Sequence, residues 1–405
     1  MDLVVMKFGG TSVADAERIR RAARRAIQEK LEGRRVVMVV SAMGKTTDKL
    51  ITLAKEITDS PPRRELDMLL TTGEQVSISL MAMAIHAAGH EAISLTGGQI
   101  GLITDTAHTK ARIQKIDADR IRQELDNGNI VIVAGFQGID ERGEITTLGR
   151  GASDTTALAL AAVLQANHCE IYTDVDGVYT TDPRIDPKAR KIERISYDEM
   201  LELASQGAGV MHSRAIEFGK KYNVVIHVRS SFTDTEGTYI TQEVKQMEQI
   251  VVSGVAVKKE LAQFVLNGLP NRPGVAASVF AHVAEHNVAV DDIIQTFDEK
   301  GEASISFTVD YGDLAEGKLV VEEIRKQFHL QEVVCRNPVA KVSAVGVGMR
   351  SHTGVAKKMF QALAEAQVNI NAITTSEIKI SCLINPEDAE KAVRVVHAVF
   401  ELDKK

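Results

Sequence analysis

The sequence predicts an α/β protein with an open, mainly parallel sheet flanked by helices, followed by two smaller α+β units. Three observations lead to this fold class. Strand-like and helix-like stretches alternate up to about residue 230, and a glycine pair follows the first strand. Two stretches that begin at Gly274 and Gly354, 80 residues apart, are identical at 8 of 23 positions. The alternation is typical of parallel βαβ units, and a long repeat present twice indicates a duplicated small domain.

The elements of the first unit follow from the spacing of apolar residues. Short apolar runs bounded by turn residues predict strands, and apolar residues three or four apart predict helices. In the first helix, Ile19, Ala22, Ala23, Ala26 and Ile27 recur at helical spacing, with arginines on the other face. The predicted strands lie within residues 3–6, 34–44, 90–98, 129–138, 169–175 and 223–231, and the predicted helices within 14–30, 118–128, 155–167 and 197–222.

The repeated stretches define the rest of the chain. Each is preceded by a turn and followed by a β-rich stretch, residues 304–310 in the first and 378–384 in the second. This spacing suits a βαββαβ unit. We therefore predict three units, which are residues 1–245, residues 262–340, and residues 246–261 together with 341–405.

The composition argues against several classes of function. The net charge of −7 disfavours nucleic acid as the main partner, because phosphate binding needs a basic surface. The longest apolar run, residues 76–88, is shorter than the roughly 18 residues that span a bilayer. We expect no membrane partner and no signal peptide. The three cysteines, Cys169, Cys335 and Cys382, are scattered, which indicates reduced thiols in a cytoplasmic protein without disulfides or a zinc site.

A lysine stands at the end of the first strand, beside two glycines. In KFGGTS, residues 7–12, the glycines would let backbone N–H groups approach an anion, and Lys7 would supply a cation. The alternative is a tight strand-to-helix turn whose lysine extends into solvent. Ser41, Gly135 and Asp174 also follow strands, so they should share the edge of the parallel sheet at which ligands bind.

Arg150 lies between Gly149 and Gly151, just before an Ala/Leu-rich helix. Its guanidinium and the first N–H groups of that helix would converge on one anion, and a planar carboxylate suits the arginine fork. Asp154 could instead cap the helix.

Three further stretches carry weaker signals. The GKT at residues 44–46 is not a P-loop, because Val39 stands where that motif requires glycine. The loop 173–184 is rich in Gly and Asp and contains a Tyr and an Arg, so it could hold a nucleotide or be a plain turn-rich loop. Glu74, at a helix start, could be a surface acid favoured by the helix dipole or a group that binds an ammonium ion.

Together these stretches resemble the aspartokinase family, within the wider amino acid kinase fold. The matching segments, in the family's order, are KFGGTS, SAMGKTTD, TTGEQVS, GFQG, TLGRGASDTTA, YTDVDGVYTTDPR and VRSSF. The duplicated tail is similar to the paired ACT regulatory domains of these enzymes, so residues 1–245 would be the catalytic domain. The resemblance covers essentially the whole chain. It implies ATP-dependent phosphorylation of the β-carboxylate of L-aspartate to 4-phospho-L-aspartate, for the lysine, threonine and methionine pathways.

The resemblance also implies roles for individual residues. Lys7, Asp154 and Arg150 would be catalytic, with Lys7 stabilising the transferring phosphoryl group and Asp154 organising Lys7. Mg²⁺ would be held mainly by ATP and not by a protein cage. Gly209 stands where some members have a nucleotide-contacting lysine, so the grip on ATP is expected to differ slightly. The residues implied for ATP are Lys7, Phe8, Gly9, Gly10, Thr173, Asp174, Tyr179, Asp182 and Arg184, and those implied for aspartate are Ser41, Thr47, Glu74, Arg150, Gly151 and Ser153.

The tail implies regulation. In enzymes of this family, ACT domains from two subunits bind end-product amino acids at their interface, which implies a homodimer or larger oligomer inhibited by lysine, threonine or both. The repeats could instead serve only for dimerisation. Some members make the regulatory half separately from an internal start, and Met247 lies where such a start could fall. The candidate effector residues are Asn271, Gly274, Val275, Ala276, Asp292 and Gln295 in the first repeat, and Asn369, Asn371, Thr374 and Thr375 in the second.

Two other functions remain as alternatives. A sister kinase of the same fold would act on glutamate, N-acetylglutamate or a nucleotide, but would not be expected to combine VDGVYTTDPR with two ACT repeats. A catalytically silent amino-acid sensor would have no need for Lys7 beside a glycine pair, together with Arg150 and Asp154. The nucleophile explains why no catalytic base stands out, because a side-chain carboxylate with a pKa of about 3.9 is already ionised at pH 7.

Overall fold

The structure is a computed structural model of the chain, and it describes residues 2–149, 151–242, 251–297, 301–350 and 352–404. Arg150 and Met247, which the sequence analysis singled out, lie outside the described residues. The chain divides into two compact units. The first contains residues 1–179, 191–204 and 209–245, and the second contains residues 180–190, 205–208 and 246–405. The predicted catalytic domain, residues 1–245, included the two short segments that fold with the second unit.

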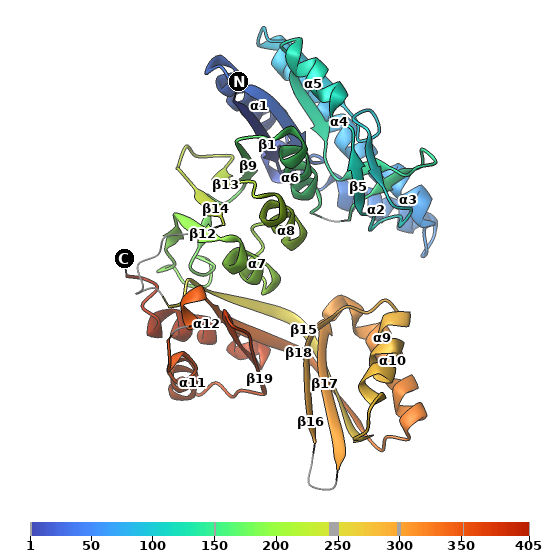
Figure 1. Cartoon of the computed structure of the whole chain (residues 1–405), viewed down its shortest axis with the longest axis vertical. Coiled ribbons are helices and arrows are strands. Elements are labelled where there is room, and N and C mark those ends of the chain that lie inside the picture. Colours follow the sequence, from blue (N-terminus) through green and yellow to red (C-terminus); the bar gives the residue numbers. More distant parts are fainter. Residues whose placement is uncertain (1, 150, 243–250, 298–300, 351, 405) are drawn as a thin grey trace. The chain divides into compact units, whose positions relative to one another are not determined.

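The first unit is built on an eight-stranded sheet, as the alternating pattern predicted (Figure 1). Among the residues that the structure describes, neighbouring strands of this sheet pair in parallel, except for the antiparallel pair β13–β14. In sheet order the strands are β12 (Arg194–Ser196), β14 (Thr238–Thr241), β13 (Ile226–Ser230), β9 (His168–Thr173), β1 (Leu3–Phe8), β2 (Arg35–Val40), β6 (Ile130–Ala134) and β3 (Ala92–Leu95).

In the described part of this unit, two smaller sheets and eight α-helices complete the fold. The small sheets are β5 (Ile113–Ile116), β4 (Leu102–Thr104), β7 (Gln137–Ile139) and β8 (Ile145–Thr147), and the pair β10 (Val178–Tyr179) with β11 (Lys191–Ile192). The helices are η1 (Gly10–Val13), α1 (Ala16–Leu31), α2 (Thr46–Ile57), α3 (Arg63–Leu70), α4 (Thr72–Ala87), α5 (Asp119–Asp126), α6 (Ser153–Leu164), α7 (Tyr197–Ser205) and α8 (Ser213–Tyr222).

Residues of β1 alternate between the two faces of the sheet. Val4, Met6 and Phe8 belong to the hydrophobic core that the sheet forms with α1 and α4. Because side chains alternate along a strand, Lys7 faces the other side of the sheet, where α6 packs on β1. The five apolar residues predicted for the inner face of α1 are all buried.

The ends of five parallel strands, β1, β2, β6, β9 and β13, are joined by backbone hydrogen bonds. The N–H groups of Gly9, Ser41, Gly135 and Ser231 donate to Tyr172, Phe8, Val40 and Thr173, respectively, over 2.9–3.3 Å. These bonds continue the sheet ladder into the turns. The carboxyl ends of β1, β2, β6, β9 and β13 therefore form one edge, as the sequence positions of the first four predicted.

One predicted helix is two helices. The apolar spacing predicted a single helix within residues 197–222, but the structure has α7 and α8 with a break between them. Gly207 in the break has φ of +105°, and a Cβ there would lie 2.4 Å from the carbonyl oxygen of Val257. The backbone turns at Gly207 because this residue packs against the backbone of Val257, about 50 residues later in the chain. Helical periodicity could not reveal such a distant contact.

The apolar helical stretch formed by α3 and α4 is longer than the run of residues 76–88 that the sequence indicated. Within the described residues, the helical stretch Arg63–Ala87 is long and apolar enough to cross a membrane by length and composition. Buried positions make up 44% of its most apolar window, and Ile78, Met81, Ala82 and Ile85 belong to the core beneath the sheet. This burial is typical of a core helix in a globular domain.

The second unit is built on one six-stranded sheet with two long central strands, β15 and β18, that run between two pairs of helices (Figure 1). In sheet order the strands are β16 (Val290–Phe297), β17 (Glu302–Asp310), β15 (Gly254–Pro270), β18 (Val333–Val345), β20 (Lys379–Ile384) and β19 (Ala372–Thr375). The helices are α9 (Val275–Glu285), η2 (Tyr311–Asp313), α10 (Leu314–Phe328), η3 (Val347–Arg350), α11 (Val355–Glu365), η4 (Pro386–Asp388) and α12 (Ala389–Val399).

The two repeats form two separate hydrophobic cores. One core contains Phe264, Phe307 and Ile324 and lies between the sheet and α9 and α10. The other contains Val342, Met359 and Val393 and lies between the sheet and α11 and α12. Both repeats thus bury a helix pair on their own part of the shared sheet.

Candidate functional site

The glycine pair after β1 is required by close packing. A Cβ at Gly10 would lie 2.8 Å from the carbonyl oxygen of Ala42 and 3.0 Å from that of Gly44. The N–H of Gly44 donates to the Gly10 carbonyl over 2.9 Å. The turns after β1 and β2 are therefore packed backbone to backbone. At Gly9, a Cβ would lie 3.4 Å from Lys7 Nζ, so glycine leaves the space beside the ammonium open.

Lys7 and Asp154 form an ion pair on this edge of the sheet. Lys7 Nζ lies 2.6 Å from Asp154 Oδ1, and the two side chains are 12% and 8% exposed. The alternative in which the lysine extends into solvent is therefore wrong. A buried charge is stable only with a partner, and α6 supplies that partner from the first turn of the helix.

Asp154 does not cap α6. The residue at the N-cap position is Ala152, and Asp154 is the second residue of the helix. Its other oxygen, Oδ2, lies 3.5 Å from the backbone nitrogen of His212, which donates to it. His212 precedes α8, so one carboxylate connects β1, α6 and the loop before α8. No role was predicted from the sequence for His212, although Gly209 lies only three positions before it.

Glu74 is not a surface acid. It lies in the first turn of α4, is 3% exposed, and accepts the N–H of Ala42 on Oε1 over 3.1 Å. Its other oxygen, Oε2, is buried without a hydrogen-bond partner among the described residues. Burial raises the pKa of Glu74 to about 7, against the opposing effect of the Ala42 hydrogen bond. An unpartnered buried carboxylate oxygen is suited to a cationic ligand group.

The other residues implied for aspartate lie on neighbouring turns. Ser41 follows β2, and Thr47 is in the first turn of α2; both are half-buried. Ser153 begins α6 and packs against Gly135, where a Cβ would lie 2.6 Å from Ser153 Oγ. Gly151 has φ of +74°, a left-handed conformation that favours glycine.

The residues implied for ATP fall into two groups. Thr173 ends β9 and donates to Asp174 Oδ1 over 3.1 Å, and the Tyr179 hydroxyl donates to Asp176 Oδ1 over 2.7 Å. Burial and this hydrogen bond raise the pKa of Tyr179 to about 12. Phe8 is buried and stacks on Tyr172, with ring centroids 4.7 Å apart.

Asp182 and Arg184 form the second group, because they belong to the second unit. They pair with each other, and Arg184 Nη2 lies 2.8 Å from Asp182 Oδ2. Both line a polar hollow of about 620 Å³ whose other walls include Lys258, Lys259 and Glu390. Their role in ATP binding stays a prediction.

Two residues that were not predicted from the sequence, Asp67 and Arg214, hold the segment before Arg150. Asp67, fully buried on α3, accepts the Thr109 N–H and the Thr147 hydroxyl and contacts His108 Nδ1 at 2.9 Å. Arg214 on α8 donates to the carbonyl oxygens of Leu148 and Ala111, both over 3.1 Å. No local motif marks either residue, since their partners lie 41 to 103 positions away.

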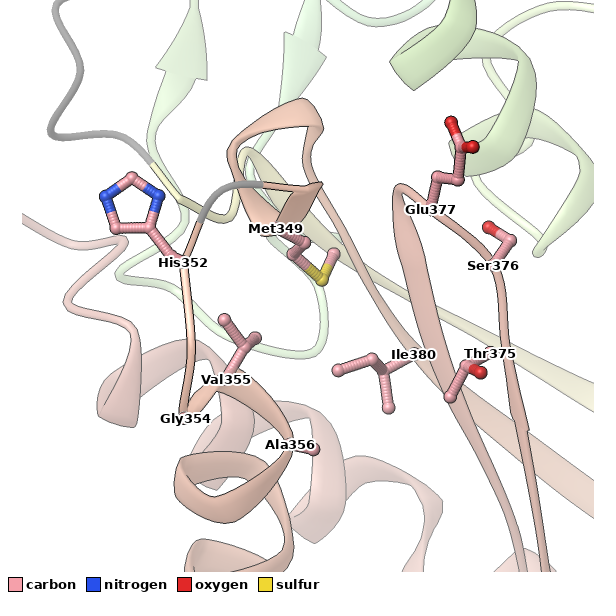
Figure 2. Close-up of a pocket in the computed structure, with 9 residues that line it drawn as sticks. All are labelled: Met349, His352, Gly354, Val355, Ala356, Thr375, Ser376, Glu377 and Ile380. Carbon is pink, nitrogen blue, oxygen red and sulfur yellow. The ribbon is translucent and has the colours of Figure 1, made fainter.

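A hollow of about 490 Å³ lies in the second repeat, between α11 and β20 (Figure 2). Figure 2 shows Val355 and Ile380 on opposite sides of this hollow, with His352 and Glu377 also at its edge. Of the predicted effector residues, Thr375 lines it. The volume suits a small molecule such as an amino acid, and the lining combines apolar side chains with a few polar groups.

A second feature links the two repeats. Lys341, fully buried on β18, contacts Asp291 Oδ2 at 2.6 Å and Asp292 Oδ2 at 2.9 Å, and the Thr374 hydroxyl donates to Asp292 Oδ1 over 3.2 Å. Asp292 and Thr374, predicted in different repeats, are therefore in direct contact. Lys341 was not predicted from the sequence, because a lysine in a strand gives no local sign of burial.

The remaining predicted effector residues occupy the ends of helices and strands. Gly274 has φ of +93° and precedes α9, in the place that Gly354 takes before α11. Asn369 donates to Asn371, which in turn donates to Asn385. Asn271 precedes α9, Val275 and Ala276 begin it, and Gln295 lies on β16. An effector role for all of these residues stays a prediction.

The sequence is similar to known proteins over its full length. Residues 2–230 match the model of the amino acid kinase family, and residues 342–400 match that of an ACT domain. The aspartokinase of Bacillus sp. (strain MGA3) is 51% identical over 402 residues, which are 99% of this chain and 98% of that protein.

Two solved structures of E. coli aspartokinase III are similar in fold at 26% sequence identity, and each alignment covers 98% of this chain and 99% of that chain. The complex with aspartate and ADP (R-state) has a TM-score of 0.85. The complex with lysine and aspartate (T-state) has a TM-score of 0.77.

Proposed function

This chain belongs to the aspartokinases of the amino acid kinase family, and we propose that its Lys7–Asp154 pair marks the point of phosphoryl transfer. The enzyme phosphorylates the β-carboxylate of L-aspartate with ATP and gives 4-phospho-L-aspartate. One observation supports our assignment above all. An ammonium group, held by a buried carboxylate, stands beside two glycines at the edge where five parallel strands end.

The reaction needs positive charge and positioning more than a base. The aspartate β-carboxylate is already ionised at neutral pH, so no proton has to be removed from it. The obstacle is the repulsion between this anion and the triphosphate, which cationic groups in a fixed geometry reduce. Lys7 Nζ faces the space that Gly9 leaves open, and would neutralise the γ-phosphoryl group there.

The site fits Mg²⁺ carried by the nucleotide. Mg²⁺ in kinases is bound through phosphate oxygens, waters and one or two carboxylates. Asp154 supplies a buried carboxylate beside Lys7, and Asp174 supplies another at the end of β9. When bound, the metal ion would add positive charge to the phosphates, while Asp154 keeps Lys7 in place.

The aspartate substrate would bind between the turns after β2 and β6. Glu74 would receive its ammonium group on the unpartnered Oε2. Ser41, Thr47, Gly151 and Ser153 would supply polar contacts, and Arg150 would bind a carboxylate. A guanidinium and a carboxylate at opposite ends would orient an α-amino acid with its side-chain carboxylate toward the γ-phosphate.

The test of the activity is a hydroxamate assay. The enzyme is incubated with ATP, Mg²⁺ and hydroxylamine, together with aspartate, glutamate or no amino acid. We expect aspartyl hydroxamate with aspartate only, because an acyl phosphate is trapped by hydroxylamine. A larger signal with glutamate would favour a sister amino acid kinase. No signal with any substrate would favour a catalytically silent sensor.

We further propose that lysine inhibits the enzyme by binding the hollow in the second repeat. The carboxylate of Glu377 at its edge suits an ε-ammonium group, and Val355 and Ile380 suit the methylene chain. The lysine-bound T-state structure of E. coli aspartokinase III is consistent with lysine as the effector. Threonine, alone or together with lysine, is the second candidate effector.

We expect saturating lysine to remove more than half of the wild-type activity. Glu377→Gln should raise the lysine concentration for half-inhibition by roughly 10- to 100-fold, since a hydrogen bond between charged groups contributes about 1.5–3 kcal/mol. The matched control is Glu365→Gln, which changes an exposed carboxylate on α11 of the same repeat. If both variants need the same lysine concentration for half-inhibition, the hollow is not the lysine site. Unchanged wild-type activity with lysine and threonine together would reject the regulation.

The remaining assignments are also proposals. We propose that the catalytic domain is residues 1–245 and that the ACT domains are residues 262–340 and residues 246–261 with 341–405. The enzyme would assemble as a homodimer or larger oligomer through its ACT domains. It would work in the cytoplasm, with reduced cysteines.

A further inference from the structure

The segment Thr180–Arg190 is a part of the catalytic sequence that folds with the second ACT repeat. It lies between β10 and β11, both of which belong to the first unit. Ile185 is part of the hydrophobic core that α11 and α12 form with the sheet. The N–H of Val255 donates to the Thr180 carbonyl over 2.7 Å, and Arg394 Nε donates to the Ile185 carbonyl over 2.9 Å. The second repeat therefore determines the conformation of this segment.

A fully buried histidine on α12 contacts the segment at Thr180 and at Asp186. His397 is 1% exposed, and it lies between Asp186 and Thr180, which are also buried. Its Nδ1 is 3.1 Å from Asp186 Oδ2, and its Nε2 is 2.9 Å from Thr180 Oγ1. The Thr180 hydroxyl oxygen also accepts the N–H of Arg190 over 2.9 Å.

These contacts fit a neutral imidazole in one tautomer. Nδ1–H donates to the Asp186 carboxylate, and Nε2 accepts the hydrogen of the Thr180 hydroxyl. The hydroxyl oxygen of Thr180 then accepts the backbone N–H of Arg190. Each polar group of the network therefore has a hydrogen-bond partner. Burial lowers the pKa of His397, which favours the same neutral form.

A hydrogen-bond network of this kind stabilises one conformation of the segment Thr180–Arg190. An apolar core would tolerate small shifts of Thr180 and Asp186, whereas a buried polar group loses its hydrogen bond when it moves. Thr180 directly follows Tyr179, one of the residues implied for ATP, and Asp182 and Arg184 lie within the segment itself. The conformation of the loop 173–184 is therefore coupled to α12.

We propose that His397 is a positioning residue, which from the last helix of the second ACT repeat holds Thr180 and Asp186 and so keeps the loop 173–184 competent to bind ATP. This inference rests on the proposed role of that loop in ATP binding. If the loop adopts its binding conformation in only a fraction of the molecules, the apparent Kd for the ligand equals the intrinsic Kd divided by that fraction. Loss of the network should therefore raise the KM for ATP, with little change in the KM for aspartate.

The test uses Thr180→Val, which replaces the hydroxyl by a methyl group of similar size, and Thr180→Ser, which keeps the hydroxyl. We expect Thr180→Val to raise the KM for ATP about tenfold and to leave the KM for aspartate within twofold of wild type. Thr180→Ser should restore the wild-type KM for ATP. His397→Gln, which removes the donor to Asp186, should behave like Thr180→Val.

The matched control is Thr308→Val on β17. Thr308 is as buried as Thr180 and accepts the N–H of Asp292 on its hydroxyl, but it lies outside this network. We expect it to lower the melting temperature about as much as Thr180→Val, without a change in the KM for ATP. Equal KM values for ATP in the two valine variants would overturn the proposal, and so would a Thr180→Ser enzyme that resembles Thr180→Val.

Binding of ADP to the full-length protein, measured by calorimetry without aspartate, separates this inference from the proposed function. If Thr180→Val weakens ADP binding while the wild type forms no aspartyl hydroxamate, the positioning role stands and the proposed reaction fails. If the wild type is active and ADP binds equally to all variants, the positioning role fails and the reaction stands.

Discussion

Replacing Lys7 with methionine should lower kcat by about 1,000-fold, because this loss is typical when one group that stabilises transition-state charge is removed. Methionine keeps most of the volume of the lysine stem, so the change removes mainly the charge. The KM for aspartate should change little, since Glu74 and the turns after β2 remain in place. Steady-state kinetics with the hydroxamate assay measures both constants.

The double variant Lys7→Met/Asp154→Asn separates catalysis from stability. Lys7→Met alone leaves the Asp154 carboxylate buried without its cation, which should destabilise the fold by about 3–5 kcal/mol. Neutralising Asp154 in the double variant should restore most of the decrease in melting temperature caused by Lys7→Met, but should not restore the turnover. A near-normal kcat in either variant would refute the role of Lys7.

Replacing Glu74 with glutamine should raise the KM for aspartate by roughly 10- to 100-fold and abolish its pH dependence below pH 7. The pKa of Glu74 is raised to about 7 by burial, and only the ionised carboxylate can pair with the ammonium group of aspartate. In the wild type, the affinity for aspartate should therefore fall up to tenfold per pH unit as the pH drops below 7. Measuring the KM from pH 5.5 to 8.5 tests this expectation.

The same carboxyl group makes a prediction about stability. Its folded-state pKa of about 7 exceeds the ordinary value of 4.5, so the folded protein binds more protons between these pH values and loses stability as the pH rises through them. Glu74→Gln should be more stable than the wild type at pH 8 by up to about 3 kcal/mol, and this difference should vanish below pH 4.5.

The matched control for Glu74 is Glu124→Gln on α5. Glu124 is also buried, but it pairs with Arg120 and Asn129. Its replacement should affect neither the KM for aspartate nor the pH profile of that constant. If the wild-type KM is flat from pH 5.5 to 8.5, Glu74 is not the group that binds the substrate ammonium.

Several parts of the site could be predicted because they depend on neighbours in the sequence. KFGGTS combines a strand, a cation and a turn within six residues, and the structure has Lys7 at the end of β1 beside Gly9 and Gly10. The apolar spacing of α1 predicted its buried face, residue by residue. Local periodicity failed at Gln206–His212, where a tertiary contact of Gly207 breaks the helix.

Other parts could not be predicted, because they depend on residues far apart in the chain. The sequence left Glu74 open between a surface acid and a ligand group, and the structure decided this by burying it against Ala42. The contact of Lys341 with Asp291 and Asp292 bridges about 50 positions. The network of His397 joins residues 217 positions apart.

The sequence by itself determined the type of fold and the edge of the sheet that carries the chemistry. Strand alternation and turn residues are local properties, and parallel strands must bring their carboxyl ends together. Only the tertiary structure decided which charges are paired, which carboxyl group titrates near neutrality, and which unit holds Thr180–Arg190. These properties depend on the burial of each side chain and on its distance from other charges. Both result from contacts between segments that are far apart in the chain.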